Sequence, residues 1–485
     1  MQTLRFLRRA VACLLVVSLT LEPVLAQLPE LGDPASAALS PSRERRIGAM
    51  AMRQIRQDES SYIDDPEIEY YLNSLGRRLV QASGFPPQDF NFFALNDNTV
   101  NAFAMPGGYI GVHSGLVTLT QGESELAGVL AHEIGHVEQK HIVRMVDSQG
   151  AGTIALVAGL LVALLVGGRG KSGGDIGQAA VMSGQAAMIQ NQLSFSQSFE
   201  READRVGFQT LNAAGFDIRG MENFFERLAR VAGSERSDTA FLRTHPLTSE
   251  RIADMQGRAS MLVPHSVADS NDYVLTRAKL DAMNGTPRDA LLRIQSASAP
   301  RRQDQAARWY AIARVQLRQK NPAEAAKALA QLRSLRFESP LVEMLAADVA
   351  SAQGQVAQAA AICEAALQRY PAAHYLQLSR ALALIEIGQA DLAAQLARDA
   401  IVDAPGDVRW HVLLSKAYAA QGKTADQQRA QAELFVLNDD LEGAIQQLRL
   451  AQRSGAGDYF TQSAIDARLR ELRAKQKEKL ADKLE

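Results

Sequence analysis

The chain has 485 residues, of which 47% are hydrophobic and 22% are charged, and its formal net charge is −2. At roughly 150 residues per domain, this length predicts roughly two to four domains. The composition is that of a globular protein and excludes a chain that is disordered throughout. The near-neutral charge argues against a protein that coats nucleic acid, so we expect no nucleic-acid partner. The two cysteines, Cys13 and Cys363, exclude a disulfide framework and a cysteine zinc cage.

The N-terminus has the pattern of a secretory signal peptide. Three arginines precede an apolar run from Ala10 to Leu21, and small residues follow at Val24 and Ala26. We therefore expect residues 1–26 to be removed, which leaves residues 27–41, rich in Pro, Gly, Ser and Ala, as a flexible leader. The alternative is an uncleaved anchor helix. It is disfavoured because the run is shorter than the ~20 residues that span a bilayer.

The next elements mix helices and strands. Hydrophobic periodicity predicts helices over 42–58 and 66–81, then strands over 90–95 and 109–118. Thr120 and Glu123 have the spacing of a capping box, so we expect a helix from Thr120 to about Val146. Ala102 to Met105 could be a sheet edge to which a peptide substrate adds as a strand, or an ordinary hairpin strand in the core.

The second half of the chain repeats with a period of 34 residues. Glycines, alanines and prolines recur at this spacing, as in Gly354, Gly388 and Gly422, in Ala325, Ala359 and Ala393, and in Pro371 and Pro405. Small residues where two helices meet, with proline after the second helix, are typical of tetratricopeptide repeats. An alanine-rich bundle without a true repeat is the alternative. We expect the repeats to form a concave binding surface.

The strongest chemical signal is His132-Glu133-Ile134-Gly135-His136, which lies inside the helix predicted from Thr120. Histidines four residues apart project from one face of a helix, so both can bind one zinc ion. Glu133 is placed to act as general base toward a water that zinc activates for attack on a peptide carbonyl. The alternative is an ordinary amphipathic helix with two histidines on its polar face.

Catalytic zinc usually keeps three protein ligands, so a third ligand is required. A histidine at the metzincin spacing is absent, because Gln139 and Ile142 stand where that motif has glycine and histidine. His141 is one residue short of this spacing. We expect it to be solvated or to support a ligand from behind.

A downstream glutamate is the better candidate for the third ligand. In the helix predicted around Phe199, Glu200 and Asp204 are four residues apart and share a face, while Glu202 points away. The pair suits a zinc ligand and a carboxylate that accepts the other ring N–H of a ligating histidine. Taken alone, both would more often be surface charges.

These motifs resemble, in their order, the M48 family of zinc metallopeptidases. The resemblance covers roughly residues 45–260 and rests on HEIGH at 132–136, EREAD at 200–204 and the upstream segment Val100 to Ile110. It implies one zinc ion held by His132, His136 and Glu200, with Glu133 as general base and Asp204 as the paired acidic residue of the catalytic centre.

The signal peptide and the repeats together resemble the periplasmic branch of this family. The resemblance implies a periplasmic enzyme that acts on unfolded or stalled outer-membrane β-barrel proteins. It also implies contact between the repeat domain and the outer-membrane protein assembly machinery.

Thr244-His245-Pro246 and Arg251 also resemble the family pattern. His245 could approach the open zinc position and hold the enzyme latent, or it could stabilise the oxyanion of the transition state together with Arg251 nearby. A histidine before proline is otherwise often an ordinary loop residue.

Ala151 to Gly168 is an apolar stretch of borderline transmembrane length. A single crossing would put the histidines and Glu200 on opposite sides of a membrane, which is incompatible with one shared ion. We favour segment 151–189 as a mobile cover of the cleft or a peripheral membrane contact, over a buried re-entrant hairpin.

We therefore expect an α+β, mostly α architecture. A gluzincin-type HExxH protease domain over 42–262 with a small sheet precedes an all-α tetratricopeptide solenoid over 270–485. The favoured function is a periplasmic zinc metalloendopeptidase whose repeats bind clients in a chaperone-like way. The alternative is a non-proteolytic chaperone or adaptor of outer-membrane protein assembly, in which the protease half is a scaffold.

Overall fold

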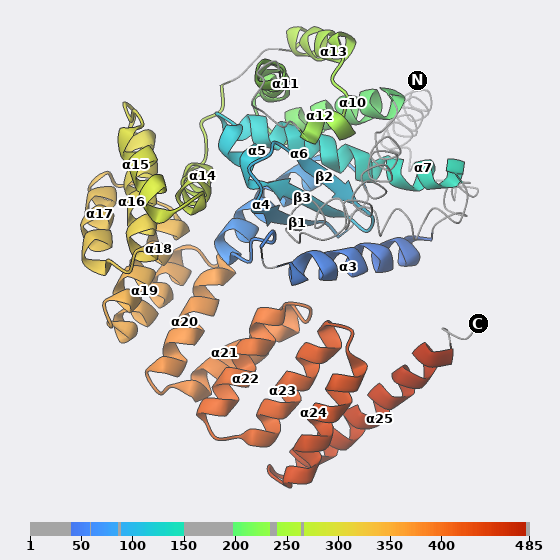
Figure 1. Ribbon diagram of the computed structural model, residues 1–485, viewed down its shortest axis with the longest axis vertical. Helices are drawn as coiled ribbons and strands as arrows, with labels where there is room; N and C mark the ends of the chain where they lie inside the picture. The colour runs from blue at the N-terminus through green and yellow to red at the C-terminus, as the bar shows by residue number, and fades with distance from the viewer. Residues whose placement is uncertain are drawn as a thin grey trace, which may run out of the picture.

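The computed structural model describes residues 40–58, 60–85, 89–149, 197–232, 240–262 and 266–481. The expected signal peptide 1–26, nearly all of the leader 27–41 and the apolar segment 151–189 lie outside the described residues. Figure 1 shows a small sheet surrounded by helices, followed by an arc of paired helices that ends at the C-terminus. Among the described residues, no helix is both long enough and apolar enough to cross a membrane.

A three-stranded mixed sheet lies at the centre of the first part. It consists of β1 (Asn91–Leu95), β2 (Ala102–Met105) and β3 (Tyr109–His113) in the order β1-β3-β2. Strand β3 runs parallel to β1 and antiparallel to β2. Among the described strands, β2 pairs only with β3 and is therefore a sheet edge, with Ala104 paired to Ile110. Its use by substrate remains a prediction.

The strand expected over 109–118 is too long. It ends at His113, and α5 (Ser114–Leu119) follows directly. The Ser114 hydroxyl and the Gly115 amide both donate to the carbonyl of Asp97, at 2.9 and 2.8 Å. These bonds turn the chain into a helix despite the β-branched residues that follow, because local hydrogen bonds outweigh strand propensity here.

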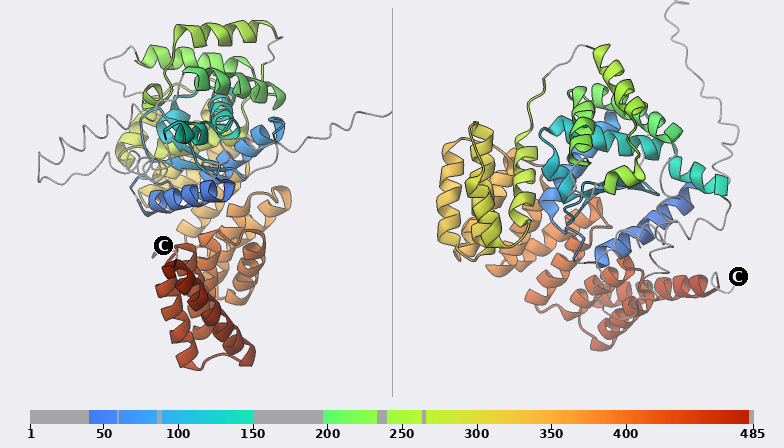
Figure 2. Two further views of the ribbon diagram at one scale, coloured as in Figure 1. Left: turned by 90° about the vertical axis from the view of Figure 1, so that its right-hand side faces the viewer. Right: turned by 45° about the horizontal axis from the view of Figure 1, so that its top comes forward.

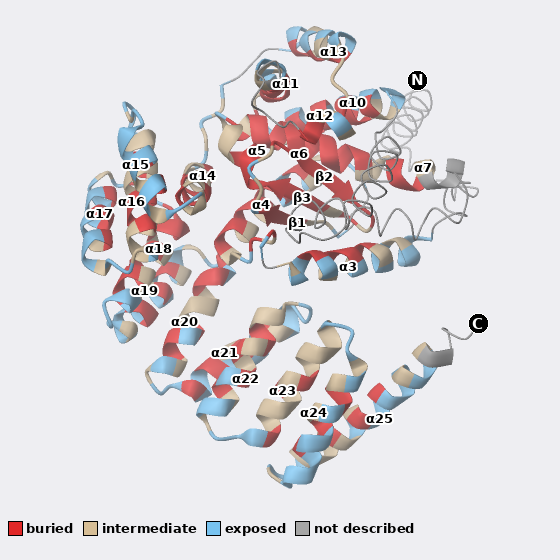
Figure 3. Cartoon of the chain, in the orientation of Figure 1, coloured by how far each residue is buried: buried red, intermediate tan, exposed pale blue. Residues whose placement is uncertain are grey.

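Alternating side chains of the sheet pack against helices on both faces. On one face, Phe93 and Phe103 pack against α3 (Pro41–Gln57) through Met52 and Ile55. On the other face, Ala102, Ala104 and Ile110 join the largest apolar core, together with α4 (Pro66–Ala82) and α6 (Glu123–Glu138). Figure 3 shows that buried residues concentrate around this sheet and α6. The helix that carries HExxH is therefore held in the centre of the core.

The helix expected from Thr120 to Val146 is also wrong at both ends. Helix α6 begins at Glu123, and its first amide donates to the distant Asp269 carboxylate at 2.7 Å, whereas the Thr120 hydroxyl bonds the Val117 carbonyl and the Tyr273 hydroxyl. It ends at Glu138, and α7 (His141–Gln149) starts after Lys140, whose φ is 52°. A left-handed residue cannot continue an α-helix, so the chain changes direction before His141.

In the described ranges 197–232 and 240–262, the first part also contains four helices: α10 (Gln197–Ala213), α11 (Arg219–Ala232), α12 (Ala240–Thr244) and α13 (Ser249–Ser260). Glycines let α6 and α10 approach closely. A Cβ at Gly207 would lie 2.9 Å from the backbone nitrogen of His132, and one at Gly135 would lie 3.1 Å from the carbonyl oxygen of Ala203. This close packing brings HEIGH and EREAD together.

The second part is a tetratricopeptide-like solenoid of paired helices. Gly354, Gly388 and Gly422 follow the first helix of three successive pairs with φ between 71° and 81°, and Ala359 and Ala393 are buried in the second helices. The helices are α14 (Asn271–Met283), α15 (Pro287–Ser296), α16 (Arg302–Arg318), α17 (Pro322–Ser334), α18 (Pro340–Ala352), α19 (Val356–Arg369), α20 (His374–Glu386), α21 (Ala390–Asp403), α22 (Val408–Ala420), α23 (Thr424–Leu437), α24 (Leu441–Ser454) and α25 (Tyr459–Ala481).

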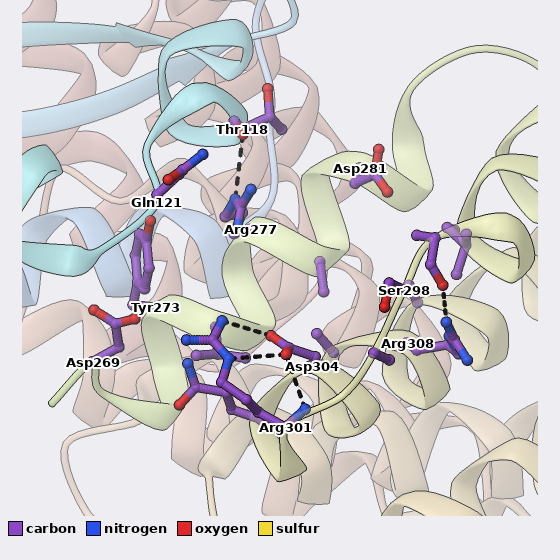
Figure 4. Close-up of a pocket in the computed structure, with 18 residues that line it drawn as sticks. Thr118, Gln121, Asp269, Tyr273, Arg277, Asp281, Ser298, Arg301, Asp304 and Arg308 are labelled. Carbon is purple, nitrogen blue, oxygen red and sulfur yellow. Dashed lines mark hydrogen bonds and ion pairs between the residues drawn. The ribbon is translucent and has the colours of Figure 1, made fainter. Parts of the chain in front are cut away.

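The two parts contact each other through α4 and α5 on one side and through α14, α16, α20 and α22 on the other (Figures 1 and 2). A pocket of about 330 Å³ lies at this junction, where α5 and the turn after it meet α14 and α16. Figure 4 shows Arg277 reaching from α14 to the carbonyl of Thr118, and Arg301 paired with Asp304. The catalytic motifs do not contribute to this pocket, so it belongs to the domain junction.

Candidate metal centre

Four buried side chains converge at the contact between α6 and α10. His132, His136, Glu200 and His245 each offer one ligand atom, and these atoms lie within 4.8 Å of one another. The Nε2 atoms of His132 and His136 are 3.0 Å apart, and the Glu200 carboxylate oxygens lie 3.5 and 3.4 Å from them. Zinc bonds of about 2.1 Å in a tetrahedron place two donors roughly 3.4 Å apart. The donor set and its spacing therefore fit zinc.

The sequence explains how three of these groups meet. His132 and His136 are one turn apart on α6, and Glu200 lies in the first turn of α10, which packs along α6. His245 follows α12 directly, and its ring stacks on Phe241 with centroids 4.5 Å apart. Its Nδ1 lies 3.0 Å from Glu200 and 3.4 Å from His132 Nε2. The structure thus places His245 as a fourth donor beside the other three.

A carboxylate–guanidinium pair lies behind the cluster. The Nδ1 atom of His132 is 3.0 Å from Asp204. Arg251 donates to both Asp204 oxygens at 2.6 and 2.7 Å, and its guanidinium also lies 2.8 Å from Glu200. Burial raises the pKa of Asp204, but the bonds from Arg251 and His132 lower it overall. Arg251 therefore keeps two buried carboxylates ionised and fixed in place.

The cluster strongly favours positive charge. Burial alone would lower the pKa of His132, but Asp204 and Glu200 outweigh burial and raise it to about 10. Burial likewise raises the pKa of Glu200, yet its histidine neighbours, led by His245, bring it far below the usual range. The negative potential of the carboxylates can be compensated by a proton on His132 or by a metal cation shared by the donors. Only the metal cation uses the lone pair of the imidazole nitrogen as a ligand.

Glu133 lies beside the donors and is buried. Among the described residues, neither oxygen of its carboxylate has a hydrogen-bond partner, although His245 Nε2 is 3.6 Å away. Burial raises the pKa of this carboxyl. A buried carboxylate left without donors is typical of a site that works on a bound group rather than of a structural contact.

His141 is a residue whose place the sequence left open. It is buried rather than solvated, and its Nδ1 lies 2.9 Å from Nδ1 of His136. Its Nε2 lies 3.2 Å from Glu202. Burial lowers the pKa of His141 to about 4. Of the two places left open by the sequence, the structure therefore shows the one behind a ligand, and the turn at Lys140 makes it possible, because a continuous helix would have carried His141 around to another face.

Comparison with known proteins agrees with this geometry. Residues 66–259 match the model of peptidase family M48. The β-barrel assembly-enhancing protease of Yersinia pestis is 32% identical over 93% of this chain and 92% of its own length. The protein of the same name from Escherichia coli K12 is 33% identical over 92% of this chain and 91% of its own.

The chain belongs to the M48 peptidase family. M48 peptidases are zinc-dependent, and the cluster of His132, His136, Glu200 and His245 is able to bind a metal ion. The chain is accordingly a metalloendopeptidase with a tetratricopeptide-like solenoid, as the sequence predicted.

Proposed function

We propose that His132, His136 and Glu200 are the zinc ligands of this peptidase. The observation that carries the proposal is the meeting of two imidazole nitrogens and one carboxylate at 3.0–3.5 Å, buried in the protein core. When bound there, zinc supplies a Lewis acid that polarises a carbonyl and acidifies water.

Glu133 is the general base in this proposal, because its carboxylate is beside the donors and holds no hydrogen bond that would compete for a proton. Its raised pKa brings it closer to neutral pH, where proton transfer is most effective. Asp204 orients the His132 ring, and Arg251 fixes Asp204 and Glu200. Both act as positioning residues rather than as groups that touch substrate.

His245 holds the enzyme latent in this proposal. Its ring lies against Glu200, His132 and Glu133 at once, where a substrate carbonyl would have to bind. The oxyanion role requires His245 to move away from Glu200 first. Displacing the histidine would open the coordination position that catalysis needs.

The substrates follow from the relatives, which are named for β-barrel assembly. We propose that the chain acts in the periplasm, cleaves misassembled outer-membrane β-barrel proteins, and contacts their assembly machinery through the solenoid. The apolar segment 151–189 is proposed as a cover or peripheral membrane contact. The solenoid can also retain clients without cleavage, but a buried Glu133 beside the metal donors favours hydrolysis over a purely non-proteolytic adaptor.

The purified mature chain tests this proposal through its zinc content and its hydrolysis of casein. We expect one zinc per chain, and we expect Glu133→Gln to lower hydrolysis by about 100- to 10,000-fold while keeping the metal. Glu138→Gln, at the end of the same helix, is the matched control and should retain activity. Full hydrolysis by Glu133→Gln would remove the residue from its role.

A further inference from the structure

A second polar chain runs from the metal cluster toward the edge of the domain. It starts at Nδ1 of His136, continues through the His141 ring and ends on Glu202, with spacings of 2.9 and 3.2 Å. Arg144 lies 3.0 Å from the same Glu202 oxygen. The chain runs from α6 through α7 to α10 and therefore ties the two ligand-bearing helices, α6 and α10, together from behind.

The proton positions along this chain follow from the chemistry of imidazole. If His136 uses Nε2 as a ligand atom, its proton is on Nδ1, which then donates to Nδ1 of His141. His141 accepts there only as the tautomer that carries its proton on Nε2, and that proton points at the Glu202 carboxylate. The two contacts are thus compatible with one assignment of protons.

The surrounding structure holds the His141 ring in this orientation. The ring is fully buried and stacks on Phe199 with centroids 4.4 Å apart and an interplanar angle of 10°. Arg144 packs over the Phe199 ring, with its guanidinium 4.5 Å from the ring centroid. The turn at Lys140, with φ 52°, is what brings His141 back to His136.

We propose that His141 and Glu202 are positioning residues for His136, which set its tautomer so that Nε2 faces the metal. This inference rests on the proposed zinc ligands. Each ligating histidine then has its own carboxylate: Asp204 contacts His132 directly, whereas Glu202 acts on His136 through a neutral imidazole. Fixing the ring in advance lowers the cost of ordering it when the metal binds.

Side-chain shape supplies a matched series of variants. His141→Asn keeps an acceptor near the Nδ1 position but loses the link to Glu202. His141→Phe keeps the stack on Phe199 and loses both polar contacts. Glu202→Gln keeps an acceptor without the charge, at a side chain that is 26% exposed. Glu226→Gln on α11, which is paired at the surface with Arg230, is the control.

Zinc affinity of the full mature chain, measured by competition with a chelator, tests the inference. We expect His141→Phe to weaken zinc binding by about 10- to 100-fold, His141→Asn and Glu202→Gln by less, and Glu226→Gln not at all. In zinc-loaded protein labelled with 15N-histidine, the protonated Nδ1 of His136 should be protected from exchange in wild type and in His141→Asn, but not in His141→Phe.

Each outcome is decisive. Wild-type affinity in both His141→Phe and Glu202→Gln, with a protected Nδ1 proton, would overturn the positioning role while leaving the zinc ligands in place. A wild-type chain that binds no zinc would overturn the ligand assignment itself and this inference with it. Should His141→Phe fail to fold, Glu202→Gln and His141→Asn alone must show the intermediate loss.

Discussion

The buried charged cluster at the domain junction and the one at the metal centre differ in how their charge is compensated. At the domain junction, Lys279 contacts Glu67 at 2.5 Å and Asp65 at 2.6 Å, and Arg314 contacts Glu67 at 2.7 Å. The hydroxyl of Tyr310 also donates to Glu67. Two buried or nearly buried carboxylates therefore face two side-chain cations, so their charges balance, and Arg314 makes a further pair with Asp348, whose side chain is 31% exposed.

The metal centre is not balanced in this way. Its carboxylates are Glu133, Glu200 and Asp204, and Arg251 is the one guanidinium that contacts them among the described residues. With neutral imidazoles, the ionised site carries two excess negative charges. A buried cluster completed by its own side chains closes an interface, whereas one with excess negative charge and convergent donors favours the binding of a divalent cation.

Removing the metal should have the largest effect. A zinc chelator should lower casein hydrolysis to the level of Glu133→Gln and should lower the unfolding temperature, because an ion that binds only the folded chain at 1,000 times its Kd contributes about 4 kcal/mol. Adding zinc back should restore both properties. If chelator changed neither hydrolysis nor the unfolding temperature, the metal centre would not need a metal ion and would not differ in this respect from the cluster at the domain junction.

Removing one charge at the domain junction should affect stability instead of chemistry. Glu67→Gln removes the buried carboxylate that Lys279 and Arg314 share, which leaves Lys279 with Asp65 and Arg314 with the partly exposed Asp348. It should lower the free energy of unfolding by about 3 kcal/mol, measured by thermal unfolding. Zinc content should not change. Glu69→Gln is the control, since its pair with Arg409 is partly exposed and should contribute no more than about 1 kcal/mol. Equal losses in the two variants would contradict the role of burial.

Removing the fourth donor should have a smaller effect of opposite sign. If His245 keeps roughly nine-tenths of the molecules latent, His245→Ala should raise the initial rate of casein cleavage by about ten-fold. His374→Ala, at an exposed position of the solenoid, is the matched control. Slower cleavage by His245→Ala would instead favour the oxyanion role and would remove His245 from latency.

The sequence could predict what depends on local periodicity. Helical spacing puts His132 and His136 on one face of a helix and Glu200 and Asp204 on one face of another, whereas their meeting at one ion was implied by the resemblance to the M48 family. The 34-residue period predicts the solenoid, with Gly354 and its equivalents at the turns. These features need only the geometry of single helices or helix pairs.

The remaining features depend on contacts between distant residues or on single backbone angles. Lys140 adopts a left-handed conformation that its residue type does not signal, so the break between α6 and α7 was not predicted, and the sequence could not decide whether His141 is solvated or supports a ligand. The Thr120 hydroxyl forms a hydrogen bond with Tyr273, 153 residues away, rather than capping the helix. Glu67 and Lys279 are 212 residues apart, and nothing in their local sequence pairs them.

The central claim is tested most directly by locating zinc in crystals of the mature chain through its anomalous scattering. The account predicts one ion about 2.1 Å from Nε2 of His132, Nε2 of His136 and an oxygen of Glu200. An ion held elsewhere, or a Glu200 carboxylate that stays out of bonding distance of an ion on the two histidines, would contradict it.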